Sequence, residues 1–247
     1  KIYTVIIVSF IFSINAIAQS PTLAWAKTLG GNSSNLGRSI VTDALGNVYT
    51  FGELYGTADF DPGAGVYNMT SNGNSDVFIS KLDAAGNFVW AKQLGGVDTE
   101  FAGQIALDGS GNIHTTGLFR ATVDFDPNAG VFNITGSLNV DFFVSKLDPN
   151  GNFIWAKASS SSNGSIAGYD ITVDGSGNVY TTGVLNNTAD FDPNAGVFNL
   201  VSSGQQDIFV CKWSSIGNFV WAKKLGGGSQ EYGYSIALDA SKNVYTT

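Results

Sequence analysis

The sequence GNFVWAKQLGG, residues 86–96, decides the fold because it returns at a fixed spacing along the chain. It recurs as GNFIWAKASS at residues 151–160 and as GNFVWAKKLGG at residues 217–227, and a shorter form, LAWAKTLGG, occupies residues 23–31. The tryptophans of these copies are 65, 65 and 66 residues apart (90 − 25, 155 − 90 and 221 − 155). A fixed period of this length predicts a repeat architecture. The four tryptophans are Trp25, Trp90, Trp155 and Trp221.

The composition limits the class of protein and the class of partner. Only 13% of the 247 residues are charged, against about 25% in typical globular domains, and 13% are aromatic, which argues against a disordered chain. The formal net charge is −8. An acidic chain is a poor match for nucleic acid, whose phosphates select basic surfaces, and for an anionic membrane surface.

The first 18 residues, KIYTVIIVSFIFSINAIA, have the features of a secretory leader. A lysine precedes a short apolar run, and an A-x-A sequence ends just before Gln19. This order predicts a signal peptide over residues 1–18 and a secreted or cell-surface protein. The apolar run is short for a retained membrane helix, so we expect no membrane insertion of the mature chain. The alternative is a buried N-terminal strand.

Each repeat after the leader contains two predicted β-hairpins. In the first repeat, short apolar runs at residues 39–43 and 47–52 form one pair, and residues 76–83 and 88–94 form the second. The connecting D-x-x-G-N sequences are typical of tight turns, in which Asp bonds nearby backbone and Gly supplies a positive φ. Four strands and one tryptophan per repeat predict an all-β fold, a β-propeller of four-stranded blades.

The length predicts only part of such a propeller. Residues 19–247 number 229 (247 − 18), or about 3.5 repeats of 65 residues, whereas propellers close with about 4–8 blades. We therefore expect a partial β-propeller over residues 19–247, with repeats starting near residues 25, 90, 155 and 221. The four tryptophans are predicted to be structural and to lie between blades, because each can bury a large apolar area.

An insert built on the sequence D-F-D-P separates the two hairpins of three repeats. In an extended segment, residues i and i+2 point the same way, so two carboxylates share one side, and in two copies an asparagine follows. Hard oxygen ligands at this spacing suit Ca²⁺. The alternatives are an Asp-Pro turn that caps a small hairpin, with the phenylalanine as its anchor, and a catalytic carboxylate pair, which the presence of three copies disfavours. The candidate calcium ligands are Asp59, Asp61, Asp124, Asp126, Asn128, Asp190, Asp192 and Asn194.

Other reactive residue types are scarce, and no catalytic residue is predicted. His114 stands where other repeats have tyrosine, and Cys211 stands where they have serine, so both are interpreted as packing residues. Glu100 and Glu231 follow the LGG sequences and are expected to be solvated loop residues. A hydrolytic triad or a zinc site would need partners that the sequence does not offer.

These repeats resemble the bacterial β-propeller repeat family called SBBP repeats. The shared pattern is carried by residues 174–183 (DGSGNVYTTG), 141–148 (DFFVSKLD), 86–90 (GNFVW) and 94–96 (LGG), and the resemblance covers residues 23–247. It implies a secreted or surface-attached propeller, often within a long multidomain chain. Residues 82–90 also resemble the tryptophan motif of quinoprotein propellers, but a single cysteine excludes their vicinal-cysteine variant. No cofactor is expected beyond the candidate calcium.

The expected function is a non-enzymatic binding or scaffold module for a glycan, a protein or another surface component. Polar loops and aromatic residues such as Tyr55, Tyr67 and Tyr232 favour this role, and no oligomeric state is predicted. The alternative is an accessory propeller of a secreted hydrolase or lyase, whose catalytic residues would lie outside this sequence. Fold alone does not decide between them.

Overall fold

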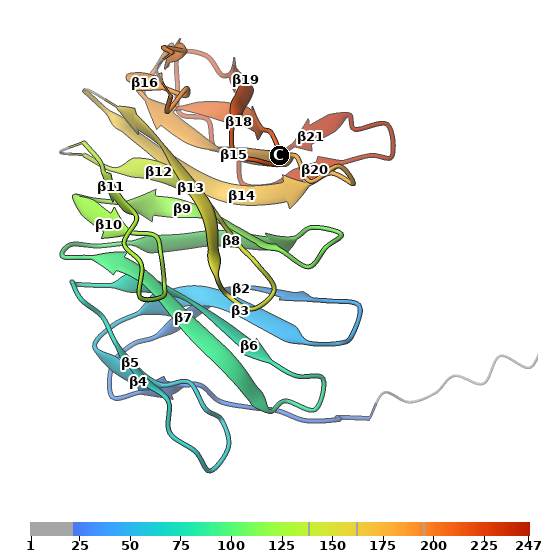
Figure 1. Cartoon of the computed structure of the whole chain (residues 1–247). Coiled ribbons are helices and arrows are strands. Elements are labelled where there is room, and N and C mark those ends of the chain that lie inside the picture. The colour runs from blue at the N-terminus through green and yellow to red at the C-terminus, as the bar shows by residue number, and fades with distance from the viewer. Residues whose placement is uncertain (1–21, 138, 162, 195) are drawn as a thin grey trace, which may run out of the picture.

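The computed structural model describes residues 22–137, 139–161, 163–194 and 196–247, and the signal peptide expected over residues 1–18 lies outside this part. All regular secondary structure in the described residues is β-strand, arranged in antiparallel sheets. The predicted fold class, an all-β propeller-like arrangement of separate blades without a closed ring in the described part, is confirmed (Figure 1). Within those residues, no helix is long and apolar enough to span a bilayer.

Three consecutive repeats each form one four-stranded blade, with the strands in chain order from the inner edge to the outer edge. Blade 1 consists of β2 (Leu36–Thr42), β3 (Val48–Leu54), β6 (Asp76–Leu82) and β7 (Phe88–Gly96). Blade 2 consists of β8 (Phe101–Leu107), β9 (Ile113–Phe119), β12 (Asp141–Leu147) and β13 (Phe153–Ser161). Blade 3 consists of β14 (Ser165–Val173), β15 (Val179–Asn186), β18 (Asp207–Trp213) and β19 (Phe219–Leu225). A further hairpin follows, β20 (Ile236–Leu238) and β21 (Val244–Thr246).

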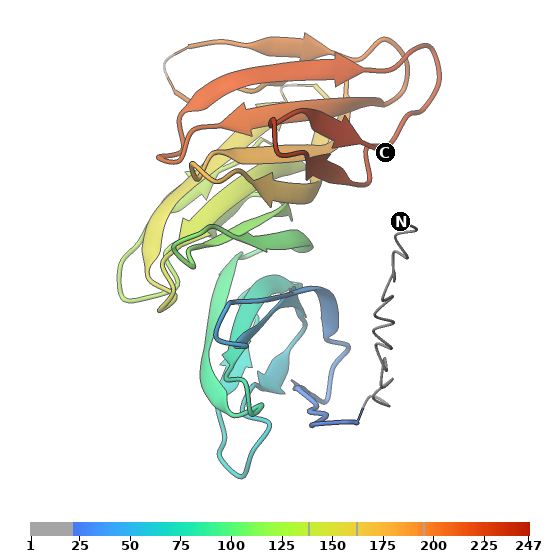
Figure 2. The ribbon, with the colours of Figure 1, turned by 90° about the vertical axis from the view of Figure 1, so that its right-hand side faces the viewer.

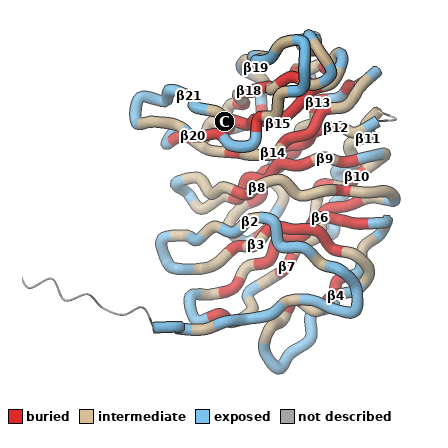
Figure 3. The backbone as a smooth tube through the Cα atoms, turned by 180° about the vertical axis from the view of Figure 1, so that it is seen from behind, coloured by how far each residue is buried: buried red, intermediate tan, exposed pale blue. Residues whose placement is uncertain are grey.

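The blades stack against one another through their inner strands. β2 contacts β8, β8 contacts β14, and β14 contacts β20, and the blades fan out one above another in the turned view (Figure 2). Burial is concentrated in the middle of the strands, whereas the turns are exposed (Figure 3). The buried apolar residues form a separate cluster at each junction, one between blades 1 and 2, one between blades 2 and 3 and a smaller one between blade 3 and β20, so each repeat packs against its neighbours as expected for a repeat protein.

The D-x-x-G-N turns have one geometry throughout. In the first, Asp43 Oδ1 accepts hydrogen bonds from the backbone N–H groups of Leu45 and Asn47, at 3.0 and 2.9 Å, and its Oδ2 accepts from Asn47 Nδ2 at 2.8 Å. Gly46 has φ of 80°, a conformation that glycine adopts without strain. In the last turn Lys242 takes the equivalent position at φ 65°. Equivalent bonds are made by Asp83, Asp108, Asp148, Asp174 and Asp239.

Each D-F-D-P insert forms a two-stranded hairpin that pairs with the preceding repeat, not with its own blade. We call these hairpins straps. The first joins β1 (Gly30–Gly31), at the end of the first tryptophan sequence, the second joins β7 of blade 1, and the third joins β13 of blade 2. The straps are β4 (Thr57–Asp59) with β5 (Asn68–Thr70), β10 (Thr122–Asp124) with β11 (Asn133–Thr135), and β16 (Thr188–Asp190) with β17 (Asn199–Val201).

The phenylalanine of each strap anchors it to its own blade. Phe125 is fully buried, and its ring centroid lies 5.1 Å from that of Phe143 on β12. Phe60 and Phe191 make the same contact, at 4.8 and 5.0 Å, with the equivalent phenylalanines of blades 1 and 3. A strap therefore ties two blades together, by backbone pairing to one and by an aromatic core contact to the other. Each buried phenylalanine contributes about 1.5–3 kcal/mol by area.

Candidate functional site

The repeated tryptophans lie at the junctions between repeats. Trp25 Nε1 donates to the carbonyl of Ala84 at 3.0 Å, and Trp155 Nε1 donates to the carbonyl of Ser215 at 3.3 Å; both acceptors belong to a turn of the next repeat. Trp90 is placed in the same way, but its buried Nε1 has no hydrogen-bond partner among the described residues. Trp221 packs edge-on against Tyr180 with centroids 6.3 Å apart. These contacts agree with a structural role for the tryptophans, which stays a prediction.

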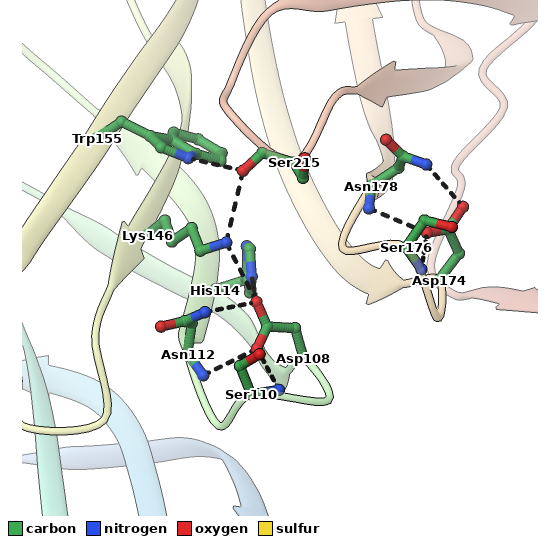
Figure 4. Close-up of polar contacts among 10 residues, drawn as sticks. All are labelled: Asp108, Ser110, Asn112, His114, Lys146, Trp155, Asp174, Ser176, Asn178 and Ser215. Atoms are coloured by element: carbon green, nitrogen blue, oxygen red, sulfur yellow. Dashed lines mark hydrogen bonds and ion pairs between the residues drawn. The ribbon is translucent and has the colours of Figure 1, made fainter.

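A buried polar network surrounds His114 at the junction of blades 2 and 3 (Figure 4). Asp108 Oδ2 lies 3.3 Å from His114 Nε2 and 3.1 Å from Lys146 Nζ, and Lys146 Nζ also donates to the carbonyl of Ser215 at 3.4 Å. Burial lowers the pKa of His114 to about 4, so the imidazole is neutral at pH 7. Burial alone would raise the pKa of Asp108, but hydrogen bonds from Asn112, His114 and Lys146 hold it well below its usual range.

The other blades show that this network is part of the repeated framework. In blade 1 Lys81 Nζ lies 4.9 Å from the ring centroid of Tyr49, and in blade 3 Lys212 has the same relation to Tyr180. His114 occupies the tyrosine position between them and is fully buried. The structure thus places His114 as a packing residue, and Cys211 is likewise a buried free cysteine.

The strap carboxylates hold the strap turns in shape. Asp124 Oδ1 accepts from the backbone N–H groups of Asp126 and Phe132 at 3.0 and 2.8 Å, and Asp126 Oδ1 accepts from Asn128 N at 3.0 Å. Asp59 with Asp61, and Asp190 with Asp192 and Asn194, repeat this pattern. Within the described ranges, no three His, Cys, Asp or Glu side chains are grouped so that they could hold a metal ion. The geometry fits the Asp-Pro turn, and calcium binding remains a prediction.

A groove on the inner strands is the best candidate for recognition. β2, β8 and β14 each contain a bulge at the same place, between Gly37 and Ser39, Ala102 and Ile105, and Gly168 and Asp170. Bulges re-aim side chains and are common beside functional sites. The residues at the equivalent position, five before the turn aspartate of each repeat (43 − 38, 108 − 103, 174 − 169 and 239 − 234), are Arg38, Gly103, Tyr169 and Tyr234.

The groove has a volume of about 500 Å³ and combines aromatic and polar walls. Tyr169 and Tyr234 are nearly parallel, with centroids 5.8 Å and planes 11° apart, and Tyr232 continues the row, 5.6 Å and 8° from Tyr234. Tyr234 is 64% exposed. The principal residues that line the groove are Arg38, Glu53, Phe101, Gln104, Tyr169 and Tyr234.

An ion pair forms one end of this groove. Arg38 donates through Nε and Nη2 to the two carboxylate oxygens of Glu53, at 2.9 and 3.2 Å, and Tyr55 donates its hydroxyl to Glu53 at 3.1 Å. The bond to Glu53 raises the pKa of Arg38. The side chain of Glu53 is buried, whereas that of Arg38 is 46% exposed, so the ion pair lies at the border between the protein and solvent. Such two-point geometry is strong and orienting.

Sequence reasoning missed two carboxylates. Glu53 stands where the next two repeats have Leu118 and Val184, so an alignment of the repeats would have singled it out. The expectation that Glu100 is a solvated loop residue is wrong: it is fully buried, its Oε2 accepts from Gly96 N at 3.0 Å, and its Oε1 has no partner among the described residues. Burial, with weaker repulsion from nearby acidic side chains, raises the pKa of Glu100 to about 8.

Comparison with known proteins finds two relatives of low sequence identity. The chain is 25% identical over 259 residues to an uncharacterized WD repeat-containing protein of Acanthamoeba polyphaga mimivirus, covering 90% of this chain and 18% of that protein. It is 28% identical over 131 residues to the regulatory protein FlaEY of Caulobacter vibrioides, covering 53% of this chain and 13% of that protein. The chain thus spans less than a fifth of the length of either relative. No protein-family model matches it.

Among solved structures, a protein of unknown function from Bacteroides caccae is 11% identical, with 78% of this chain and 83% of that chain covered at a TM-score of 0.28. That score is too low to support a common architecture. The similarity to a WD repeat-containing protein along most of the chain agrees with a propeller-like repeat protein, a class in which blades of four strands are the repeating unit.

Proposed function

We propose that this protein is a secreted or cell-surface β-propeller of the SBBP-repeat kind that acts as a non-enzymatic binding or scaffold module, with the inner-strand groove as its recognition surface. One observation carries the proposal. The repeats share their turns, tryptophans and strap anchors, yet they differ from one another at the bulge position, where Arg38, Gly103, Tyr169 and Tyr234 face the groove. A constant frame with variable residues on one concave face suits recognition.

The polar groups of the groove support binding more than catalysis. Glu53 lines the groove, and the equivalent positions of the next two repeats hold no carboxylate. Both of its oxygens accept hydrogen bonds, from Arg38 and Tyr55. A general acid or base needs a free oxygen within reach of a substrate proton. The accessory-propeller alternative would therefore draw its catalytic groups from elsewhere in a longer protein.

The test is a binding measurement with a turnover control. The purified protein would be screened by biolayer interferometry against a panel of immobilised glycans and purified surface proteins, beside a Tyr234→Ala variant of equal melting temperature. We expect at least one ligand to be bound and then lost in the variant, without product release from any ligand. Turnover of a bound ligand, or binding that is indifferent to Tyr234, would contradict the proposal.

A further inference from the structure

We propose that a cavity between two turns, residues 43–47 of blade 1 and 108–112 of blade 2, binds the ammonium group of a lysine side chain from a partner protein, with Asp43 as its counter-ion. The cavity shares no lining residue with the inner-strand groove, and the proposal does not depend on the function proposed above. It is carried by the lining of the cavity, by the carboxylate on its wall, and by a lysine of this chain that occupies the equivalent place in another repeat.

The cavity has a volume of about 530 Å³ and a mixed lining. Its walls combine the apolar side chains of Leu45, Leu107 and Pro149 with the carboxylate of Asp43. A lysine matches such a lining, because its methylene stem can lie along apolar surface while its charged head meets a counter-ion.

Asp43 is an ionised carboxylate on the wall of the cavity. Its Oδ2 accepts hydrogen bonds from Asn47 Nδ2 at 2.8 Å and from the Tyr49 hydroxyl at 3.2 Å. Burial alone would raise the pKa of Asp43, but hydrogen bonds, chiefly from Asn47, hold its pKa below the ordinary value, so the group is negatively charged at pH 7. Among the described residues, it has no ion-pair partner.

The equivalent carboxylate of blade 3 does have a lysine partner. Asp174 Oδ2 accepts from Asn178 Nδ2 at 2.9 Å, as drawn in Figure 4, and from the Tyr180 hydroxyl at 3.3 Å, the same two bonds as in the first turn. It also lies 3.4 Å from Nζ of Lys242. Lys242 comes from the turn of the following repeat and donates to Ser176 Oγ at 3.2 Å. An ammonium group therefore fits against this turn carboxylate from the side of the next turn.

A glycine stands on the wall of the cavity where the last turn has Lys242. The position three after the turn aspartate is Gly111 in blade 2 and Lys242 in the last turn (111 − 108 and 242 − 239). Both have left-handed backbone, with φ of 78° and 65°. A Cβ at Gly111 would meet only Pro149 within 4 Å, at an ordinary 3.5 Å. This junction thus lacks the internal lysine of the last one and has space for a lysine from outside.

The positive charge already beside the cavity does not exclude a second cation. Lys81 Nζ lies 4.9 Å from the ring centroid of Tyr49, and in blade 3 Lys212 has the same relation to its own tyrosine. The blade 3 junction nevertheless holds the ammonium group of Lys242 as well. The formal net charge of −8 also favours the approach of basic groups.

The hydrogen bonds of Asp43 favour an ammonium group over a guanidinium. Its Oδ1 accepts from the backbone N–H groups of Leu45 and Asn47 at 3.0 and 2.9 Å, so Oδ2 is the oxygen left for a cation. A guanidinium that binds through two parallel bonds needs both oxygens. An ammonium group is a compact point charge that needs one.

The experiment is an NMR titration of the whole nitrogen-15-labelled protein with an end-capped glycyl-lysyl-glycine peptide. We expect saturable shifts of the backbone amides of Leu45, Asn47 and Gly111, with a dissociation constant on the order of millimolar, because a single partly exposed ion pair contributes little. The same peptide with norleucine or arginine in place of lysine should bind at least about tenfold more weakly.

Two pairs of variants test the site. Asp43→Asn removes the charge and should weaken binding of the lysine peptide by about tenfold or more, whereas Asp83→Asn changes a turn that does not line the cavity and should leave binding unchanged. Gly111→Lys supplies an internal ammonium group, as Lys242 does, and should abolish binding. Gly177→Lys adds the same charge at the same φ of 78° outside the cavity and should not affect binding.

Three results would overturn the proposal. The first is equal binding of the lysine and norleucine peptides, or no saturable shift with either. The second is binding that persists in Gly111→Lys at the parent melting temperature, a result that stands even if Asp43→Asn does not fold. The third is tighter binding of cadaverine, a free diamine, than of the lysine peptide, which would assign the cavity to small amines instead of a partner protein.

Discussion

Trp155 of blade 2 covers Gly217 in a turn of blade 3 so closely that a Cβ on the glycine would lie 2.8 Å from Cδ2 of the indole. Trp25 covers Gly86 in the same way, at 2.9 Å. The glycine therefore does two things at once: it supplies the positive φ of the turn, 79° at Gly217, and it lets the turn approach the tryptophan of the preceding repeat. This contact connects the sequence motif to the stacking of blades.

Substitution of the turn glycines should separate these two roles. Gly217→Ala and Gly111→Ala both place a side chain at a φ near 78°, which costs about 1–2 kcal/mol, but the nearest atom to a Cβ at Gly111 is Pro149 Cγ at an ordinary 3.5 Å. We expect Gly217→Ala to be less stable than Gly111→Ala by a further ~1–3 kcal/mol because of the clash with Trp155. Urea denaturation of the two variants measures the difference, and equal midpoints would show that the tryptophan contact is loose.

The indole N–H groups of the tryptophans should contribute unequally to the stability of the protein. Trp155→Ala is expected to cost about 3–5 kcal/mol through loss of packing. Trp155→Phe also breaks the bond to Ser215, worth about 0.5–1.5 kcal/mol, whereas Trp90→Phe removes an N–H without a described partner. Trp155→Phe should therefore destabilise the protein more than Trp90→Phe in thermal melts. The reverse order would mean that Trp90 has a partner outside the described contacts.

Stability should fall as pH rises because of Glu100. Its pKa is raised to about 8 in the folded protein and is about 4.3 in an unfolded chain. Between these values the folded state holds one more proton than the unfolded state, so the free energy of unfolding decreases by up to about 1.4 kcal/mol per pH unit. The Glu100→Gln variant should lack this part of the slope. Denaturation curves from pH 5 to 9 test it, and parallel profiles for the two proteins would refute it.

The third repeat provides a matched control for this pH effect. There Lys224 lies 2.7 Å from Asp207, beside Glu231, whereas the equivalent residue near Asp76 and Glu100 is Gln93. Gln93→Lys should supply the missing cation and flatten the pH dependence of blade 1. The converse change, Lys224→Gln, removes the cation beside Asp207 in blade 3 and should add a second pH-dependent loss of stability there. A lack of response to both substitutions would assign the slope to other groups.

Calcium binding to the straps is tested by melting in millimolar Ca²⁺ and in EDTA. A ligand present at 100 times its dissociation constant adds about 2.7 kcal/mol, and the Asp126→Ala variant should lose that gain if the strap carboxylates bind the ion. Coincident curves for the parent protein would leave Asp124 and Asp126 with the turn-forming hydrogen bonds described above.

Local features of this fold could be predicted, and long-range ones could not. The second hairpin of blade 1, expected at residues 76–83 and 88–94, is found as β6 (Asp76–Leu82) and β7 (Phe88–Gly96), because alternating apolar residues and a turn sequence determine it locally. The pairing of each strap with the preceding repeat was not predicted, because the sequence of a three-residue strand does not determine which strand it pairs with. The groove was missed for a related reason: a bulge that re-aims Tyr169 is a property of two paired strands.

The straps also bear on how the chain folds during synthesis. Blade 1 ends at Gly96, but the backbone of Gly95 and Gly96 is paired only by β10, which belongs to the next repeat. During synthesis we expect this end of the outer strand to stay unpaired until β10 of the next repeat has emerged. The same relation between β13 and β16 predicts that blades 1 and 2 are completed in the order of their synthesis, and that a translational pause just after an LGG sequence prolongs the exposure of these strand ends.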